Sequence, residues 1–218
     1  MKFSENTLAV LKNFATINSG VVLNPGQVQK TMSSERSILL EAKLEDDIPS
    51  QFGIYDLNQF LGNITTLRNP EITFDKDSVS MSEGDFTLTY LACSPNLIIT
   101  PPADKELSIK TVDVKFTLTN ASLGRLLKLA QMNNLPHLSV VGKEGALMLK
   151  IHEKANDTSN HGFTTVSDYY GKDFFSTFKT ENLKLLPDDY DVELQIGAFA
   201  KFVNSAGNLK YFIAQETK

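Results

Sequence analysis

The stretch that decides the fold is "NASLGRLLKLAQM", residues 120–132, because its spacing is that of an amphipathic helix. Its apolar residues recur three and four positions apart on one face, which consists of Leu123, Leu126, Leu127 and Ala130. Arg125 and Lys128 lie on the opposite face as neighbours. Asn120 is the expected N-cap, and Pro136 lies just beyond the expected end. The segment therefore predicts a helix that presents two cations, although a solvated surface is the general interpretation of such a face.

Those two cations stand out because the chain as a whole is acidic. It has 218 residues, with 21 Lys and Arg against 26 Asp and Glu, and a net charge of −5. A protein that coats nucleic acid with its whole surface is expected to be basic, so this class is disfavoured. The length favours one large domain or two of about 110 residues, and 14 Phe allow substantial cores.

Three features predict a cytoplasmic protein. No apolar run reaches the roughly 18 residues that a transmembrane helix needs. The opening "MKFSENTLAVLKNF" mixes polar residues into its apolar pattern, so we expect a helix of the mature protein and not a secretion signal. The single Cys93 excludes an internal disulfide and fits a reducing compartment.

The first half of the chain predicts two helices with strands around them. Ser4 is the expected N-cap of the first helix, whose polar side includes Lys12 and Asn13. The second helix starts at Asp56, with a glutamine in the capping-box position. The two apolar stripes are Val10, Leu11, Phe14 and Ile17, and Leu57, Phe60, Leu61 and Ile64. Strand-like segments cover residues 20–24, 28–32, 37–44, 71–75, 78–82 and 86–92.

The second half repeats this order. Its helices are residues 120–132 and a short segment, residues 180–186, that ends at Pro187. Its strand-like segments are residues 112–118, 138–142, 145–153, 163–170, 189–197, 201–205 and 208–214. "LKNFATINS" in the first half matches "LKLAQMNN" in the second at an offset of about 116 residues, which is typical of duplicated domains.

A proline-containing join, "CSPNLIITPPADKEL", separates the halves. The tandem Pro101-Pro102 favours an extended conformation there. We therefore expect an N-terminal domain of residues 1–108, whose last part, residues 93–108, is the linker, and a C-terminal domain of residues 109–218. The predicted fold class is α+β, with two similar domains that each pack two helices on one face of a mostly antiparallel sheet.

The ordered set of segments resembles the sliding clamps, the ring-shaped processivity factors of DNA polymerases. "LAVLKNFATINSGVVLNPG" and "YDLNQFL" are similar to the trimeric clamp of T-even-type bacteriophages. "MSSERSILLEAKL" and "LKYFIAQE" are similar to the eukaryotic and archaeal clamp, the proliferating cell nuclear antigen. The resemblance covers the whole chain, and no individual motif is diagnostic.

The resemblance implies a non-enzymatic homotrimer without cofactor or metal. Three subunits would form a ring whose helices line a hole for duplex DNA, without reading sequence. A clamp loader would open the ring with ATP, and DNA polymerase would dock a terminal peptide under the interdomain linker. The phage clamps also assist late-gene transcription, which adds late-transcription factors to the expected partners. No membrane partner is implied.

The resemblance also assigns residues to three surfaces. The DNA-facing cations are expected to be Lys12, Arg68, Arg125, Lys128, Lys179 and Lys184. The partner-peptide pocket is expected to comprise Met32, Leu97, Ile98, Ile99, Pro101 and Phe212. The subunit interface is expected to pair residues 86–91 with residues 163–168 of the next subunit, through Phe86, Leu88, Tyr90, Phe163, Thr165 and Val166. Glu5 shares a helix face with Lys12, so we expect weak intrinsic DNA affinity.

Two other classes remain open on the sequence. An enzyme would need a catalytic or metal-binding pattern, but the histidines have no ligand spacing; they are His137, His152 and His161. The pairs Asp46-Asp47 and Asp188-Asp189 could hold two metals, yet solvated turns fit them better. A structural or assembly protein of a virion would also be acidic and without motifs, but would not need cations gathered on helices.

Overall fold

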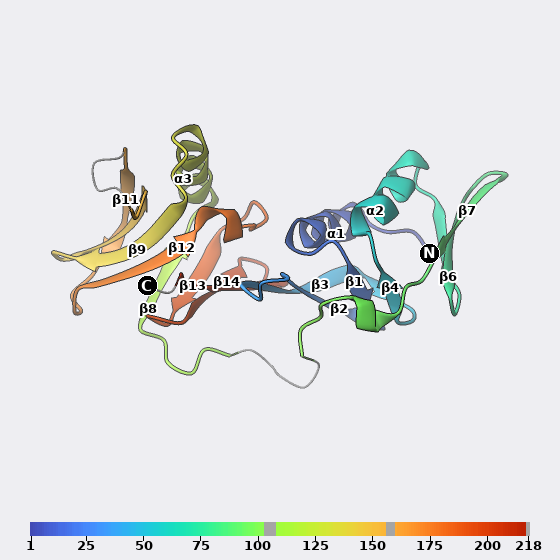
Figure 1. Cartoon of the computed structure of the whole chain (residues 1–218), viewed down its shortest axis with the longest axis horizontal. Coiled ribbons are helices and arrows are strands. Elements are labelled where there is room, and N and C mark those ends of the chain that lie inside the picture. The colour runs from blue at the N-terminus through green and yellow to red at the C-terminus, as the bar shows by residue number, and fades with distance from the viewer. Residues whose placement is uncertain (103–107, 156–159, 217–218) are drawn as a thin grey trace. The chain divides into compact units, whose positions relative to one another are not determined.

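The computed structural model describes residues 1–102, 108–155 and 160–216. The chain divides into two compact units, Met1–Lys105 and Glu106–Lys218, with a division three residues before the predicted boundary. Each unit combines helices with antiparallel strands (Figure 1). No helix in the described ranges has the length and apolar character that a membrane crossing requires.

The first unit packs two neighbouring helices against antiparallel strands. The helices are α1 (Glu5–Ile17) and α2 (Leu57–Thr66). The strands are β1 (Val21–Leu23), β2 (Gly26–Met32), β3 (Ile38–Ile48), β4 (Phe52–Ile54), β5 (Glu71–Phe74), β6 (Ser78–Glu83) and β7 (Phe86–Leu91). β2 pairs with β3, β1 with β4, and β6 lies between β5 and β7. α1 crosses over β3 and packs beside α2 (Figure 1).

The second unit has one α-helix within its described residues, α3 (Asn120–Met132). Its strands are β8 (Val114–Leu118), β9 (His137–Lys143), β10 (Ala146–His152), β11 (Gly162–Asp168), β12 (Phe174–Lys179), β13 (Tyr190–Leu194), β14 (Phe199–Asn204) and β15 (Leu209–Ala214). One antiparallel set has the order β11-β10-β9-β12 and the other β15-β14-β13-β8. Neither β12 nor the short β4 was expected from the sequence.

The predicted helices form where local signals are complete. The Ser4 hydroxyl accepts the Thr7 N–H at 3.1 Å and caps α1. The Asp56 carboxylate accepts the Gln59 N–H at 2.9 Å and caps α2. The apolar stripe of α2 is buried at all four predicted positions, so periodicity alone located its packing face.

Two details of the helix predictions are wrong. The N-cap of α3 is Thr119 and not Asn120, because Thr119 keeps an extended backbone and its hydroxyl accepts the Ser122 N–H at 3.2 Å. Asn13 of α1 is buried and does not lie on the polar side. It follows Val10 by three residues and precedes Ile17 by four, so its side chain joins their stripe.

The expected second helix of the second unit is also wrong, because only a 3-10 turn, Thr180–Asn182, forms there. The Leu186 carbonyl accepts the Tyr190 hydroxyl at 2.6 Å, and the Leu186 N–H donates to the Tyr211 hydroxyl at 3.2 Å. Pro187 further disfavours a helical Leu186. Burial raises the pKa of Tyr211 to about 12, so the phenol stays protonated in neutral solution. Tertiary hydrogen bonds thus capture the backbone of a segment too short to be a stable helix.

Candidate functional site

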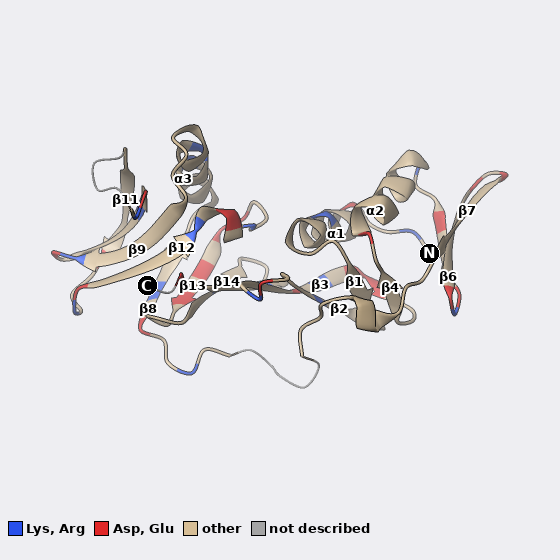
Figure 2. Ribbon diagram, viewed as in Figure 1, with Lys and Arg blue, Asp and Glu red and all other residues tan. Residues whose placement is uncertain are grey.

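The cations of the helices are exposed. Lys12 on α1 and Arg125 and Lys128 on α3 point to solvent and make no ion pair with any residue that the structure describes. Figure 2 shows the corresponding blue segments of the two helices. α3 buries Leu123 and Ala130 on its opposite side, as predicted. The arrangement leaves positive charge on helix faces that are otherwise polar.

The remaining predicted cations lie near the helices but not on them. Arg68 is exposed just beyond α2, and its backbone N–H donates to Glu83 at 3.1 Å. Lys179 ends β12 and pairs with Glu181 at 3.4 Å, while Lys184 follows the 3-10 turn and is half-buried. That turn lies beside α3, where both line a shared cavity of about 470 Å³. α3 and this turn therefore take the place of the expected helix pair.

Residues 93–102, called the strap below, divide the predicted pocket residues into buried and exposed positions. Ile98 is 9% exposed and packs onto the unit, whereas Leu97 is 66% and Ile99 44% exposed. Pro101 is half-buried and lines a cavity of about 340 Å³ with Val28 and other residues of β1 and β2. Leu97 and Ile99 are thus the exposed aliphatic side chains of the strap.

The two predicted pocket residues outside the strap are buried. Met32 at the end of β2 is 8% exposed. Phe212 on β15 is 7% exposed, and its ring lies 6.1 Å from that of Phe199. Their roles in partner binding stay predictions.

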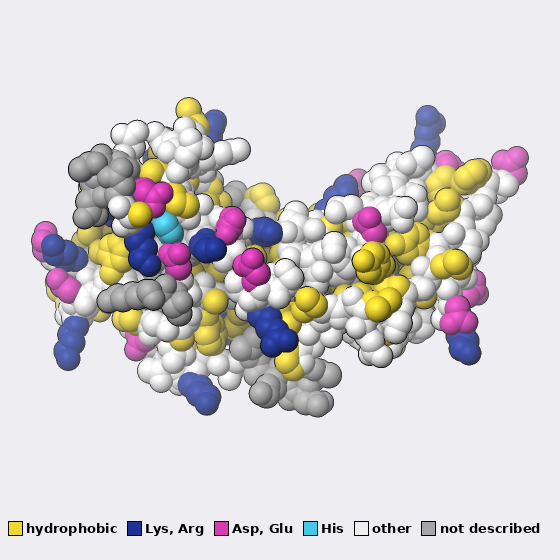
Figure 3. Space-filling view, viewed as in Figure 1, with side chains coloured by type: hydrophobic (Ala, Val, Ile, Leu, Met, Phe, Trp, Pro, Cys, Tyr) yellow, Lys and Arg dark blue, Asp and Glu magenta, His cyan; other side chains and the backbone are white. Residues whose placement is uncertain are grey.

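The two strands expected at the subunit interface are both outer strands of their sheets. Within the described residues, β7 pairs with β6 alone and β11 pairs with β10 alone. Their apolar side chains are unusually open: Phe86 is 54%, Leu91 73% and Phe163 65% exposed. Figure 3 shows apolar side chains over β7. Exposed apolar edge strands invite pairing with another chain.

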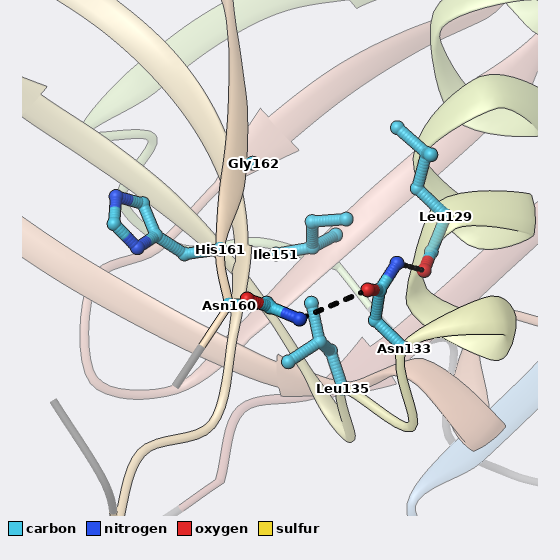
Figure 4. Close-up of a pocket in the computed structure, with 7 residues that line it drawn as sticks. All are labelled: Leu129, Asn133, Leu135, Ile151, Asn160, His161 and Gly162. Carbon is cyan, nitrogen blue, oxygen red and sulfur yellow. Dashed lines mark hydrogen bonds between the residues drawn. The ribbon is translucent and has the colours of Figure 1, made fainter. Parts of the chain in front are cut away.

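A cavity of about 520 Å³ adjoins the β11 edge (Figure 4). It lies between the end of α3 and the start of β11, where Leu129 and Ile151 supply apolar walls and Gly162 supplies no side chain. Asn160 donates to the Asn133 side chain at 3.2 Å and closes one end. The lining is mixed, because Asn133, Asn160 and His161 add polar groups to the apolar walls.

The histidines of β9 and β10 form a contact that the sequence did not predict. Antiparallel register brings His137 opposite His152, with ring centroids 5.7 Å apart. Ser139 contacts His152 Nε2 at 2.8 Å and Thr177 at 2.9 Å, which is the distance of a nucleophile–base pair. Ser139 is fully buried, however, so no substrate reaches it, and burial lowers the pKa of His152. The network joins β9, β10 and β12 and is structural.

The aspartate pairs also have structural partners. Asp46 accepts the Ser4 N–H at 2.7 Å, and Asp189 accepts the Asn120 N–H at 2.7 Å. Asp188 accepts the Asn204 amide at 2.9 Å, which lowers the pKa of its carboxyl group. Within the described ranges, no three His, Cys, Asp or Glu side chains gather in a way that could hold a metal.

This arrangement is the clamp fold of proliferating cell nuclear antigen. A chain of the complex between the C-terminal region of FEN-1 and A. fulgidus PCNA matches 100% of this chain over 99% of its own length, with a TM-score of 0.72 and 12% identity. The antigen from Entamoeba histolytica matches 99% of this chain and 98% of its own, with a TM-score of 0.65 and 15% identity. At such identities the likeness establishes the fold.

Sequence comparison adds the family. The family model described as DNA polymerase processivity factor matches residues 3–99. The sliding clamp of Enterobacteria phage T4 is 30% identical over 99% of this chain and 97% of its own. Those of Escherichia phage RB69 and Vibrio phage KVP40 are 29% and 28% identical over 99% of this chain and 97% and 99% of their own. The chain belongs to the sliding clamp family of DNA polymerase processivity factors.

Proposed function

We propose that three copies of this chain close into a ring around duplex DNA and tether the phage DNA polymerase during synthesis. The observation that carries this proposal is the set of exposed cations on α1 and α3, which have no ion pair among the described residues, in a chain of the sliding clamp family. The ring acts by topology and catalyses nothing, so the buried Ser139–His152 contact has no chemical role in it.

Ring closure rests on the open strand edges. β7 of one subunit pairs antiparallel with β11 of the next, a contact between different surfaces that closes after three-fold rotation. Pairing gives hydrogen-bond partners to the free backbone groups of both edge strands. It also covers Phe86, Leu91 and Phe163, whose exposure would otherwise favour aggregation. The cavity beside Gly162 lies at the start of β11, next to this contact.

DNA binding rests on a few cations in each subunit. Lys12, Arg125 and Lys128 neutralise phosphates without reading bases, together with Arg68, Lys179 and Lys184 near the helices. Glu5 is exposed on the same helix as Lys12 and weakens the positive potential of the first unit. Weak contacts suit a ring that must slide, because its hold on DNA does not depend on affinity.

Partner binding rests on the strap. Leu97 and Ile99 offer an apolar surface to the C-terminal peptide of the polymerase and to the ATP-dependent clamp loader. The PCNA structure with the FEN-1 C-terminal region supports docking of a terminal peptide on this fold. Late-transcription factors use the same surface in the cytoplasm of the infected host.

The experiment that tests the ring is retention on DNA of different topology. After loading with polymerase accessory proteins, the clamp should remain on nicked circular duplex and leave the same duplex once it is cut to a linear form. Mass measurement should give a trimer. Equal retention on the two DNAs would contradict a topological hold, and a monomer at all protein concentrations would contradict the ring.

A further inference from the structure

The strap is useful as a docking surface only if its position is fixed before a partner arrives. A segment that must be ordered during binding lowers affinity by the entropy of that ordering. Leu97 and Ile99 face solvent, so they gain little support from packing. The backbone around Ile99 therefore needs support from hydrogen bonds.

The side chain of Asn18 makes that attachment. Asn18 is the C-cap of α1, and its amide nitrogen donates to the Ile99 carbonyl at 3.0 Å and to the Met32 carbonyl at 3.0 Å. Its amide oxygen accepts the Gly20 N–H at 3.2 Å. Both donors and the acceptor are in use, so one residue ties the helix end, the end of β2 and the strap together.

Only asparagine fits this role among residues of its size. Aspartate has the same shape but no donor, and its carboxylate would face two carbonyl oxygens. Alanine loses all three hydrogen bonds. Serine has one donor and therefore cannot serve Ile99 and Met32 at once.

Two other attachments of the strap lie before Ile99. Cys93 donates its N–H to the Gly53 carbonyl at 2.9 Å. Ile98 packs against Gly20, where an added Cβ would lie 3.3 Å from the Ile98 side chain and 3.0 Å from the Ile54 carbonyl. Among the described residues, no hydrogen bond joins residues 100–102 to the rest of the unit. Among the described residues, Asn18 therefore makes the last hydrogen bond between the strap and the rest of the unit.

We propose that Asn18 is the positioning residue of the partner surface, fixing the strap so that Leu97 and Ile99 are presented to a docking peptide. This inference rests on the proposed docking function and adds a residue that does not itself touch the peptide. It also connects the strap directly to α1, the helix that carries Lys12.

The test compares Asn18→Asp and Asn18→Ala with the parent protein and with Asn58→Asp. Asn58 is exposed on α2, so its substitution makes the same charge change away from the strap. Two quantities are measured on the full chain: the Kd of a fluorescent C-terminal peptide of the phage polymerase, and the rate at which thermolysin cuts the folded protein before the aliphatics of the strap. Urea unfolding reports global stability.

We expect both Asn18 variants to bind the peptide about five- to tenfold more weakly, which corresponds to one or two hydrogen bonds. Strap cleavage should accelerate by a similar factor, while Asn58→Asp matches the parent in both measurements. Parent-like affinity or parent-like cleavage in both Asn18 variants would overturn the proposal. If the parent itself fails to bind, the docking function fails, and the cleavage rates alone decide whether Asn18 holds the strap.

Discussion

Reversing the two cations of α3, Arg125→Glu with Lys128→Glu, tests the DNA-facing surface most directly. Both side chains are exposed and unpaired among the described residues, and both lie opposite the buried Leu123 and Leu126. Surface changes of this kind usually alter stability by less than about 0.5 kcal/mol. The fold and the trimer should therefore survive, and any loss should concern DNA.

The size of the effect follows from charge counting. Two cations in each of three subunits could neutralise up to six phosphates, since two times three is six. Each phosphate contact contributes about 0.9 to the slope of log K against log salt, so the slope should fall by up to about 5. Water-bridged contacts give less, and the reversed charges add repulsion, which makes the loss of binding largest at low salt.

The assay is primer extension by polymerase with loader and clamp, read as product length over a series of salt concentrations. The double variant should give shorter products. Although the loss of binding free energy is largest at low salt, the deficit in product length should be clearest at raised salt, because strong attraction at low salt still retains even a weakened clamp during synthesis. Lys76→Glu with Lys172→Glu is the matched control, because both lysines are exposed in loops and the net charge changes equally. Parent-like product lengths at raised salt, or an equal deficit in the control, would refute the assignment.

Three further changes test the edge, the strap and the buried histidine. Phe163→Glu should raise the dissociation constant of the trimer at least tenfold, because it places a charge in the proposed interface. Tyr170→Glu, which changes an 88% exposed side chain in a loop, should leave the dissociation constant unchanged. Sedimentation over a dilution series measures both. Leu97→Ser with Ile99→Ser should weaken the polymerase peptide by tenfold or more at unchanged melting temperature, and equal binding would place the peptide elsewhere. Burial lowers the pKa of His152 in the folded chain. As the pH falls through about 6.5, the unfolded chain binds a proton at this histidine before the folded chain does, so the free energy of unfolding should decrease. His152→Gln should flatten this slope in urea unfolding between about pH 5 and 7.5, and an unchanged slope would exclude His152 as its source.

The parts of the fold that the sequence predicted are those that local signals determine. Asp56 caps α2 because a carboxylate three residues before a free N–H can reach it, and Phe60 is buried because its stripe has helical period. The cap and the stripe require no knowledge of a distant residue. The edge position of β7 also agrees with the prediction, but that prediction came from the resemblance to the sliding clamps and not from local signals.

The parts that the sequence did not predict depend on distant partners. The segment before Pro187 has helical periodicity, but hydroxyl groups of Tyr190 and Tyr211 bind its backbone instead. His137 and His152 meet only because a hairpin register sets them opposite each other. The local sequence places Asn18 at the end of a helix, but it does not predict the hydrogen bond to Ile99, which lies 81 residues away. Spacing within one element carries no information about such contacts.

The pairing of charges explains how a protein of net charge −5 can present a face to DNA. On the sheets, several cations are held by carboxylates: Lys30 pairs with Glu41 at 3.0 Å, and Lys115 with Glu193 at 2.7 Å, which lowers the pKa of the Glu193 carboxyl group. On α3, Arg125 has no such partner among the described residues. A phosphate can therefore approach the helix without breaking an ion pair, whereas at Lys30 or Lys115 it would have to displace a carboxylate. In the proposed ring, local pairing therefore favours the helical face over these paired sheet cations as the surface for DNA.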